Sequence, residues 1–261
     1  VSHIDKRGFL HFTSVGGWSN RLLPGQRVIV YGDSGPVFGV IGLKPPHLET
    51  QEEAKEVIPM RKLFIDIGAS SREEAERLGI REGSIAVLDR QVVRLSGSRV
   101  TGKAFDDRVG VACMVYALRL LEKKEIEPTV YAVATVQEEV GLIGARVSSF
   151  KITPDAAIAL DVTIACDVPG VEEKNWVTQL GKGPAIKIMD GMMVNRFIAH
   201  PSIVRFLRKI AEEEKIPYQL EVLVGGTTDA SMIALTKEGV PTGAISIPTR
   251  YIHSPIEVLD L

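Results

Sequence analysis

The pattern of apolar and polar positions changes character at about residue 98. Before that point, apolar runs of strand length are separated by turns rich in Gly, Pro and Asp, which is typical of a small, mostly β domain. One helix is predicted there, because Ser71 and Glu74 match a capping box and Gly79 is a stop signal. The predicted strands are residues 8–12, 27–31, 37–42, 63–67, 84–89 and 91–95.

From about residue 99 onward, segments of strand and helix character alternate. This alternation indicates βαβ units, and hence an α/β fold with a mainly parallel sheet and helices on both faces. We therefore divide the chain into residues 1–98 and 99–261. The first predicted helix has an apolar face formed by Val111, Val115, Leu118 and Leu121. The predicted elements are helices at 107–121, 142–150, 201–214 and 228–236, and strands at 129–137, 155–160, 218–224 and 242–247.

Composition and net charge limit the kinds of molecule that we expect this chain to bind. The chain is 45% hydrophobic and 25% charged with a formal net charge of −2, which is ordinary for a globular domain. We expect neither nucleic acid nor a membrane as a partner, because the sequence has no basic stripe and no apolar run of ~20 residues. The two cysteines, Cys113 and Cys166, do not indicate a disulfide framework, which favours a cytoplasmic location. Cys113 lies on a helical pattern and is expected in the core.

Glu138 and Glu139 stand side by side at the end of the apolar run 129–137. Open α/β sheets place their chemistry at the carboxyl ends of strands. One carboxylate of such a pair can bind a metal ion while its neighbour moves a proton. The alternative is an acidic first turn of the following helix, where negative charge is favoured in any case. Taken alone, the pair fits either interpretation.

Three further sites favour the chemical interpretation. Asp106 and Asp107 precede a helical pattern, and an N-cap role would explain only one of them. Asp161 ends the apolar run 157–160, and His253 follows the run 242–247. Carboxylates together with an imidazole suit Zn, Mn or Co. These residues therefore predict a metal site at the ends of several strands.

The segment 224–229, Val-Gly-Gly-Thr-Thr-Asp, is rich in glycine but matches neither a P-loop nor a dinucleotide fingerprint. We expect it to form a turn between a strand and a helix. Asp229 near the start of that helix is predicted either to cap it or to orient the metal ligands.

Taken together, these segments resemble the TET-type dinuclear-metal aminopeptidases, the glutamyl aminopeptidase group whose members were once described as cellulases or endoglucanases. The resemblance implies a phosphorylase/hydrolase-like zinc-peptidase catalytic domain at 99–261, with 1–98 as an inserted β-rich domain of dimerisation type. The matching stretches are Ala104 to Arg108, Ala134 to Gly141, Ala159 to Val162, Leu223 to Asp229 and Arg250 to Pro255, with Gly16 to Trp18, Pro45 to His47 and Phe64 to Gly68 in the first part.

The resemblance implies a set of metal ligands. Asp106 would bridge two divalent ions, Zn or Co and as a further candidate Mn. Glu139 and His253 would bind one ion, and Asp161 the other. The family also has a histidine from a His-x-Asp motif. His3 and Asp5 have that spacing but match a later strand of the family, so we expect the motif, and the family's C-terminal helix, to lie outside this chain.

The resemblance also implies the remaining roles. Glu138 would be the general base that activates water and then protonates the leaving amine. Asp107 would follow Asp106 through a cis peptide bond, with Asp229 nearby as a supporting residue. The implied partners are short peptides and further copies of the chain, assembled into a tetrahedral dodecamer.

Two other functions are weighed against this one. An endoglucanase-type glycoside hydrolase needs two carboxylates but neither metal nor His253. Sugar sites usually carry aromatic platforms, whereas only 6% of this chain is aromatic. A non-catalytic assembly or binding subunit is suggested by the incomplete ligand set. Sensitivity to chelators distinguishes the aminopeptidase from the glycoside hydrolase.

Overall fold

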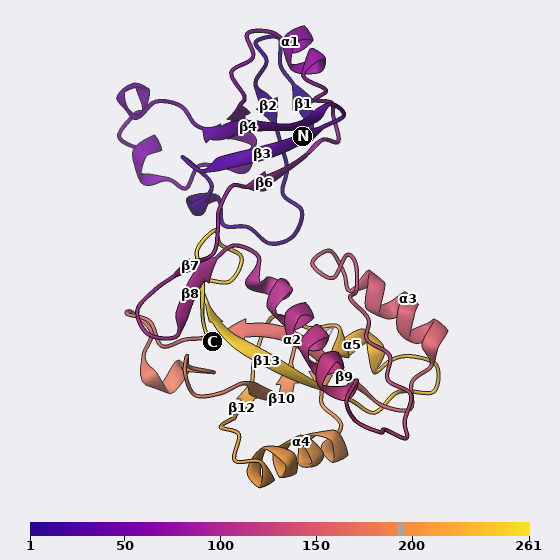
Figure 1. The fold of residues 1–261 in the computed structure, drawn as a ribbon. Helices are drawn as coiled ribbons and strands as arrows, with labels where there is room; N and C mark the ends of the chain where they lie inside the picture. The colour runs from indigo at the N-terminus through magenta and orange to yellow at the C-terminus, as the bar shows by residue number, and fades with distance from the viewer. Residues whose placement is uncertain (193–195) are drawn as a thin grey trace. The chain divides into compact units, whose positions relative to one another are not determined.

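The computed structural model describes residues 1–192 and 196–261, and the chain divides into two compact units (Figure 1). The first consists of Val1–Val92 together with the short segment His253–Pro255. The second consists of Val93–Ile252 and Ile256–Leu261. Each unit contains its own sheet. That the first unit is an inserted domain of dimerisation type stays a prediction.

The first unit is a six-stranded sheet in the order β1-β2-β5-β4-β3-β6, and all its pairings are antiparallel. Alternate residues of the strands pack into one core, as Val28 and Val30 do on β3. The predicted capping box is confirmed, because the Ser71 side chain accepts a hydrogen bond from the Glu74 N–H. The elements are β1 His3–Ile4, β2 Leu10–His11, η1 Asn20–Leu22, β3 Arg27–Gly32, β4 Gly35–Gly42, η2 Pro46–Leu48, η3 Glu53–Lys55, η4 Met60–Lys62, β5 Phe64–Asp66, α1 Arg72–Arg77 and β6 Ile85–Leu88.

The second unit contains an eight-stranded sheet in the order β11-β10-β13-β14-β8-β7, with β12 beside β10 and β9 beside β13. The prediction of alternating helices and strands is confirmed for most segments. The elements are β7 Val93–Arg94, β8 Arg99–Gly102, α2 Phe105–Leu121, α3 Ile143–Ile152, β9 Ala157–Ile164, η5 Glu173–Asn175, β10 Ala185–Asp190, β11 Phe197–Ile198, α4 Pro201–Glu213, β12 Gln219–Val222, α5 Ala230–Ile233, β13 Thr242–Arg250 and β14 Glu257–Asp260.

The sheet of the second unit is mixed. β9 runs parallel to β13 and β12 runs parallel to β10, whereas the other five pairings of the described strands are antiparallel. The mainly parallel sheet that the sequence predicts is therefore not confirmed. The longest register joins β9 to β13, from Thr242 opposite Ala157 to Thr249 opposite Ile164. This register fixes the position of Asp161 opposite Ser246.

The strand predicted at 129–137 does not form. A run of β-branched residues becomes a strand only where another strand supplies hydrogen-bond partners, and no described strand pairs with this segment. Its large apolar side chains are exposed instead, including Tyr131 at 63% and Val136 at 68%.

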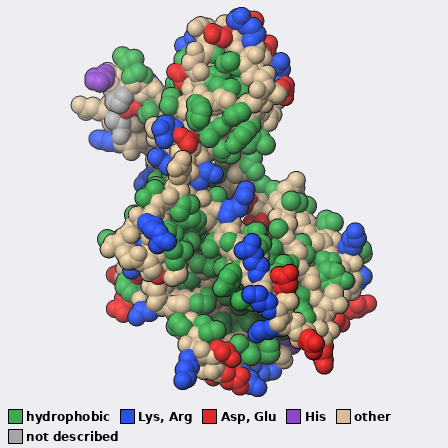
Figure 2. Space-filling view, in the orientation of Figure 1, with side chains coloured by type: hydrophobic (Ala, Val, Ile, Leu, Met, Phe, Trp, Pro, Cys, Tyr) green, Lys and Arg blue, Asp and Glu red, His purple; other side chains and the backbone are tan. Residues whose placement is uncertain are grey.

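The predicted apolar face of α2 is also exposed in part, at Val115 and Leu118. Cys113, which the sequence predicts as a core residue, is exposed as well, because no described element covers this side of α2. Figure 2 shows apolar side chains at the surface of the second unit in this region. Among the described residues, none of the helices is both long and apolar enough to cross a membrane.

A buried group of charged residues lies inside the second sheet. We call Lys187, Asp190, Glu221 and Thr163 the lysine cluster. The Lys187 ammonium lies 3.0 Å from a Glu221 oxygen and 3.7 Å from an Asp190 oxygen, and the three side chains are 2% exposed or less. The Thr163 hydroxyl donates a hydrogen bond to the other Glu221 oxygen. The cluster thus joins β9, β10 and β12 through polar contacts.

Candidate metal centre

The first turn of α2 departs from helical geometry where it carries two aspartates. The peptide bond between Asp106 and Asp107 is cis, as the family resemblance implies, and both residues have non-helical φ and ψ. The Gly110 N–H donates a hydrogen bond of 2.9 Å to Asp107 Oδ1. A Cβ on Gly110 would lie 2.3 Å from Asp107 Oδ2, so only glycine at this position allows the contact.

Glu138 and Glu139 lie on a turn that precedes α3. The Glu138 carbonyl accepts hydrogen bonds from the Gly141 and Leu142 N–H groups at 3.0 and 2.9 Å. Because α3 begins only at Ile143 and has no acidic residue in its first turn, the pair is not the acidic first turn of that helix. The turn holds the two neighbouring carboxylates in place without drawing them into a helix.

Three of the predicted ligand residues come together. Asp106, Glu139 and His253 each offer one ligand atom, and these atoms all lie within 4.8 Å of one another. His253 belongs to the connection between β13 and β14 and has a positive φ of 59°. Imidazole and carboxylate donors at this separation are suited to a divalent ion.

Asp161 lies on β9 and is 9% exposed. Burial raises its pKa well above the ordinary value, and the neighbouring charges of Asp107, Asp106 and Glu138 raise it further. One of its oxygens accepts a hydrogen bond of 2.7 Å from the Val162 N–H. The charges of the other candidate residues therefore act on Asp161. Asp161 is not one of the three residues whose ligand atoms lie within 4.8 Å of one another.

Glu138 and Asp107 are affected in the same way. Burial raises the pKa of Glu138 from 4.5 to about 8, with further contributions from Asp229, Glu139 and Asp106. Burial raises the pKa of Asp107 to about 7, against the lowering effect of its hydrogen bond from Gly110.

Asp229 stands at the N-terminus of α5, but its side chain makes no capping hydrogen bond there. It accepts a hydrogen bond of 2.6 Å from the Thr135 hydroxyl instead. Burial raises its pKa, and the Thr135 hydroxyl lowers it. Of the two predicted roles for Asp229, capping is therefore wrong, and its charge acts on Glu138.

We call these carboxylates the acidic cluster: Asp106, Asp107, Glu138, Glu139, Asp161 and Asp229. Burial, and in addition their mutual repulsion, raises the pKa values of Asp107, Glu138 and Asp161. A bound cation would relieve that repulsion, because its charge favours the ionised carboxylates. The residues present therefore fit divalent metal ions.

Two features of the site have no counterpart in the sequence predictions. Thr135 follows a run of apolar residues, and no sequence pattern indicates its contact with Asp229. Glu257, on β14, accepts hydrogen bonds from the N–H groups of Phe105 and Asp106. The only available signal for Glu257 is a single carboxylate placed before an apolar run.

His3 and Asp5 lie in the first unit. Asp5 Oδ1 accepts hydrogen bonds from the Arg7 and Phe9 N–H groups at 2.8 and 3.0 Å, which closes the turn between β1 and β2. Asp5 thus has a role within this turn, which agrees with the view that His3 and Asp5 are not the family's ligand motif.

The chain is similar to known proteins over its whole length. The sequence profile of the M42 glutamyl aminopeptidase family matches residues 1–261. The chain is similar to the structure of an aminopeptidase from the archaeon Desulfurococcus kamchatkensis, with 58% identity, a TM-score of 0.94 and coverage of 100% of this chain and 71% of that one. It is 40% identical to the lysyl aminopeptidase of Pyrococcus furiosus, over 100% of this chain and 72% of the relative.

A further solved structure bears on assembly. The TET1 peptidase of Pyrococcus horikoshii, which can assemble into a tetrahedron or a large octahedral shell, is 38% identical with a TM-score of 0.86. The similarity covers 100% of this chain and 74% of that one.

Proposed function

Because the chain belongs to the M42 glutamyl aminopeptidase family and is an aminopeptidase, we propose that it releases N-terminal residues from short peptides with two divalent metal ions and a glutamate base. The observation that carries this proposal is the convergence of Asp106, Glu139 and His253 beside other carboxylates. Glycoside hydrolysis would require two neighbouring carboxylates but neither a metal ion nor the histidine.

The donor atoms support Zn, Co or Mn as the bound ions. Asp106, Glu139 and His253 would hold one ion, and Asp106 would share the other with Asp161. When bound, such ions polarise the scissile carbonyl and lower the pKa of water. The residues of the chain hold the ions and supply the groups that move protons.

Glu138 is the proton carrier in this proposal. It lies next to Glu139 on the turn before α3, and burial together with the neighbouring carboxylates raises its pKa to about 8, which supports a role in holding a proton. A bound cation lowers that pKa toward the range of a general base near neutral pH. Glu138 would take a proton from the attacking water and then deliver it to the leaving amine.

Asp107 and Asp229 support these residues. The hydrogen bond from Gly110 fixes Asp107 directly after Asp106. The hydrogen bond from Thr135 fixes Asp229, whose charge acts on Glu138. Both carboxylates would orient the active residues without touching the peptide.

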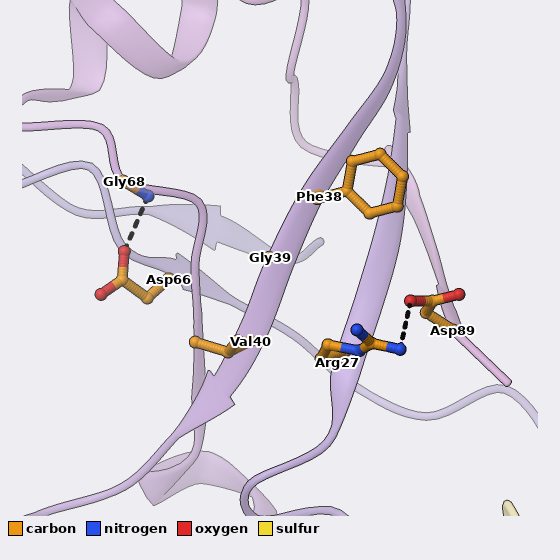
Figure 3. Close-up of a pocket in the computed structure, with 7 residues that line it drawn as sticks. All are labelled: Arg27, Phe38, Gly39, Val40, Asp66, Gly68 and Asp89. Carbon is orange, nitrogen blue, oxygen red and sulfur yellow. Dashed lines mark hydrogen bonds and ion pairs between the residues drawn. The ribbon is translucent and has the colours of Figure 1, made fainter.

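We further propose that the chain forms a homo-oligomer through the first unit, as a tetrahedral dodecamer. β3, β4 and β6 expose large apolar side chains on one face, namely Tyr31, Phe38, Val40 and Ile85. A shallow pocket on this unit is lined by Arg27, Phe38, Val40 and Asp89 (Figure 3). A patch of this kind is typical of a protein–protein contact.

A cytoplasmic location and the absence of nucleic-acid and membrane partners stay predictions. Cys113 and Cys166, both free thiols, support a reducing compartment.

The proposal is tested with a panel of aminoacyl-chromogenic substrates, before and after chelation and with Zn or Co restored. We expect metal-dependent release from free but not from N-acetylated substrates, since the enzyme acts at the N-terminus. Activity that survives complete removal of metal would refute the metal-dependent mechanism. The preferred residue in the panel would define the specificity.

A further inference from the structure

We propose that Glu257 is a positioning residue that fixes the backbone of Asp106 for metal binding. This inference rests on the proposed role of Asp106 as a metal ligand. It assigns a function to a buried carboxylate that does not itself need to touch metal or substrate.

The first residues of α2 are not regular helix, because Asp106 and Asp107 have non-helical φ and ψ. The preceding residue, Ala104, is in a left-handed conformation, and its side chain has no acceptor. Asp107 caps the regular part of the helix by accepting a hydrogen bond from the Gly110 N–H. The N–H groups of Phe105 and Asp106, which precede this cap, therefore need an acceptor from another segment.

Glu257 provides this acceptor from a distant strand. Its Oε2 accepts hydrogen bonds from the Phe105 N–H at 2.5 Å and from the Asp106 N–H at 3.2 Å. Its side chain is 2% exposed, so water competes little for these contacts.

The sheet fixes the position of Glu257. β14 pairs with β8 so that Glu257 lies opposite Gly102, a few residues before Asp106. On its other side β14 pairs with β13, and the connection between these two strands carries His253. One short stretch of chain therefore carries a predicted ligand and also holds the backbone of another.

We expect loss of this arrangement to weaken metal affinity. Residues that orient metal ligands typically contribute ~10- to 100-fold to metal affinity or activity. Loss of the acceptor frees the backbone at Asp106, whereas a glutamine at the same position keeps an oxygen that can accept the same hydrogen bonds. The effect therefore depends on an acceptor oxygen at this point.

The test measures Zn and Co affinity of the intact enzyme by competition with a chelator. We expect Glu257→Leu to weaken the affinity ~10- to 100-fold and Glu257→Gln to stay close to wild type. Leu259→Ala is the matched control, because Leu259 is also buried on β14 and packs against Phe105. It should lower thermal stability while leaving the metal affinity unchanged.

Unchanged metal affinity in folded Glu257→Leu, or an equal loss in Glu257→Gln, would overturn the inference. If the leucine variant does not fold, Glu257→Asp replaces it, since the shorter side chain withdraws the oxygen but keeps the charge. The aspartate variant should then bind metal more weakly, and wild-type affinity would overturn the inference. A wild-type enzyme that binds metal but releases no N-terminal residue would refute the proposed function and leave this inference standing.

Discussion

The second unit contains two groups of carboxylates that differ in the source of the positive charge that balances them. In the lysine cluster, the ammonium of Lys187 lies against Glu221 and Asp190 as part of the fold. In the acidic cluster, burial and then the neighbouring carboxylates raise the pKa values of Glu138 and Asp161. His253 is the imidazole among the predicted ligands.

The pKa values show the consequence of this difference. Burial raises the pKa of Asp190 to about 6, and the charge of Lys187 opposes the rise. Burial raises the pKa of Glu138 to about 8, and its neighbouring carboxylates add to the rise. The lysine cluster contains its own cation, whereas the acidic cluster would need a cation from solution to relieve its repulsion.

The largest expected effect separates proton transfer from metal binding within the acidic cluster. Glu138→Gln should lower kcat by ~10²- to 10⁴-fold, because it removes the base, while metal content stays at the wild-type level. Glu139→Ala and His253→Ala should instead lose metal. Turnover and metal content of all three purified variants provide the check. Retained turnover in Glu138→Gln would refute the base assignment, and unchanged metal content in the other two would refute their roles.

The next effect concerns the lysine cluster and bears on stability. Lys187→Met should lower the free energy of unfolding by ~3–5 kcal/mol, because it leaves two buried carboxylates without their cation. Urea denaturation of the metal-loaded protein measures this change. The double variant Lys187→Met with Glu221→Met should recover part of the loss, since a buried ion pair can be replaced by apolar side chains. A single variant as stable as wild type would show that Lys187 does not balance these charges.

The pH dependence of stability should also distinguish the clusters. A carboxyl with a raised folded-state pKa stabilises the fold below its ordinary pKa, and this contribution is lost as pH rises through the folded-state value. For Asp190 the loss is complete near pH 6, whereas for Glu138 it continues to about pH 8. The melting temperature of the chelated protein should therefore keep falling between pH 6 and 8, and added Zn or Co should suppress that fall. If the melting temperature changed with pH in the same way with and without metal, this account would be contradicted.

The smallest effect tests a single hydrogen bond at the edge of the acidic cluster. Thr135→Val removes the hydroxyl that donates to Asp229 and should cost ~1 kcal/mol of stability. Because Asp229 acts on Glu138, we also expect a shift in the pH profile of kcat without loss of metal. Thr135→Ser keeps the donor and should behave like wild type in both measurements.

Local signals predicted many elements of this fold, but β8, β10, β11 and β14 were not among them. The helix expected at 201–214 is observed at Pro201–Glu213, and Ser71 caps α1 as its spacing indicates. The segment 129–137 has a strong strand pattern but no strand partner among the described residues. Strand formation depends on a neighbour distant in sequence, which no local pattern records.

The same limit applies to the site. The acidic residues could be selected because each follows a strand-like run or precedes a helix. The contacts of Glu257 with Asp106 and of Thr135 with Asp229 join segments far apart in the chain. The lysine cluster was not predicted because its contacts also join segments that are distant in the sequence. Lys187 and Glu221 are both charged residues flanked by apolar ones.

The distribution of the predicted ligands along the chain has a consequence for synthesis in the cell. Asp106 lies at the start of α2, whereas His253 lies much later in the chain, in the connection between β13 and β14. A chain emerging from the ribosome could not complete the ligand set until β13 and the connection to β14 had been made. We expect metal loading to follow translation, so the newly made protein must reach its native sheet while its carboxylates still repel one another.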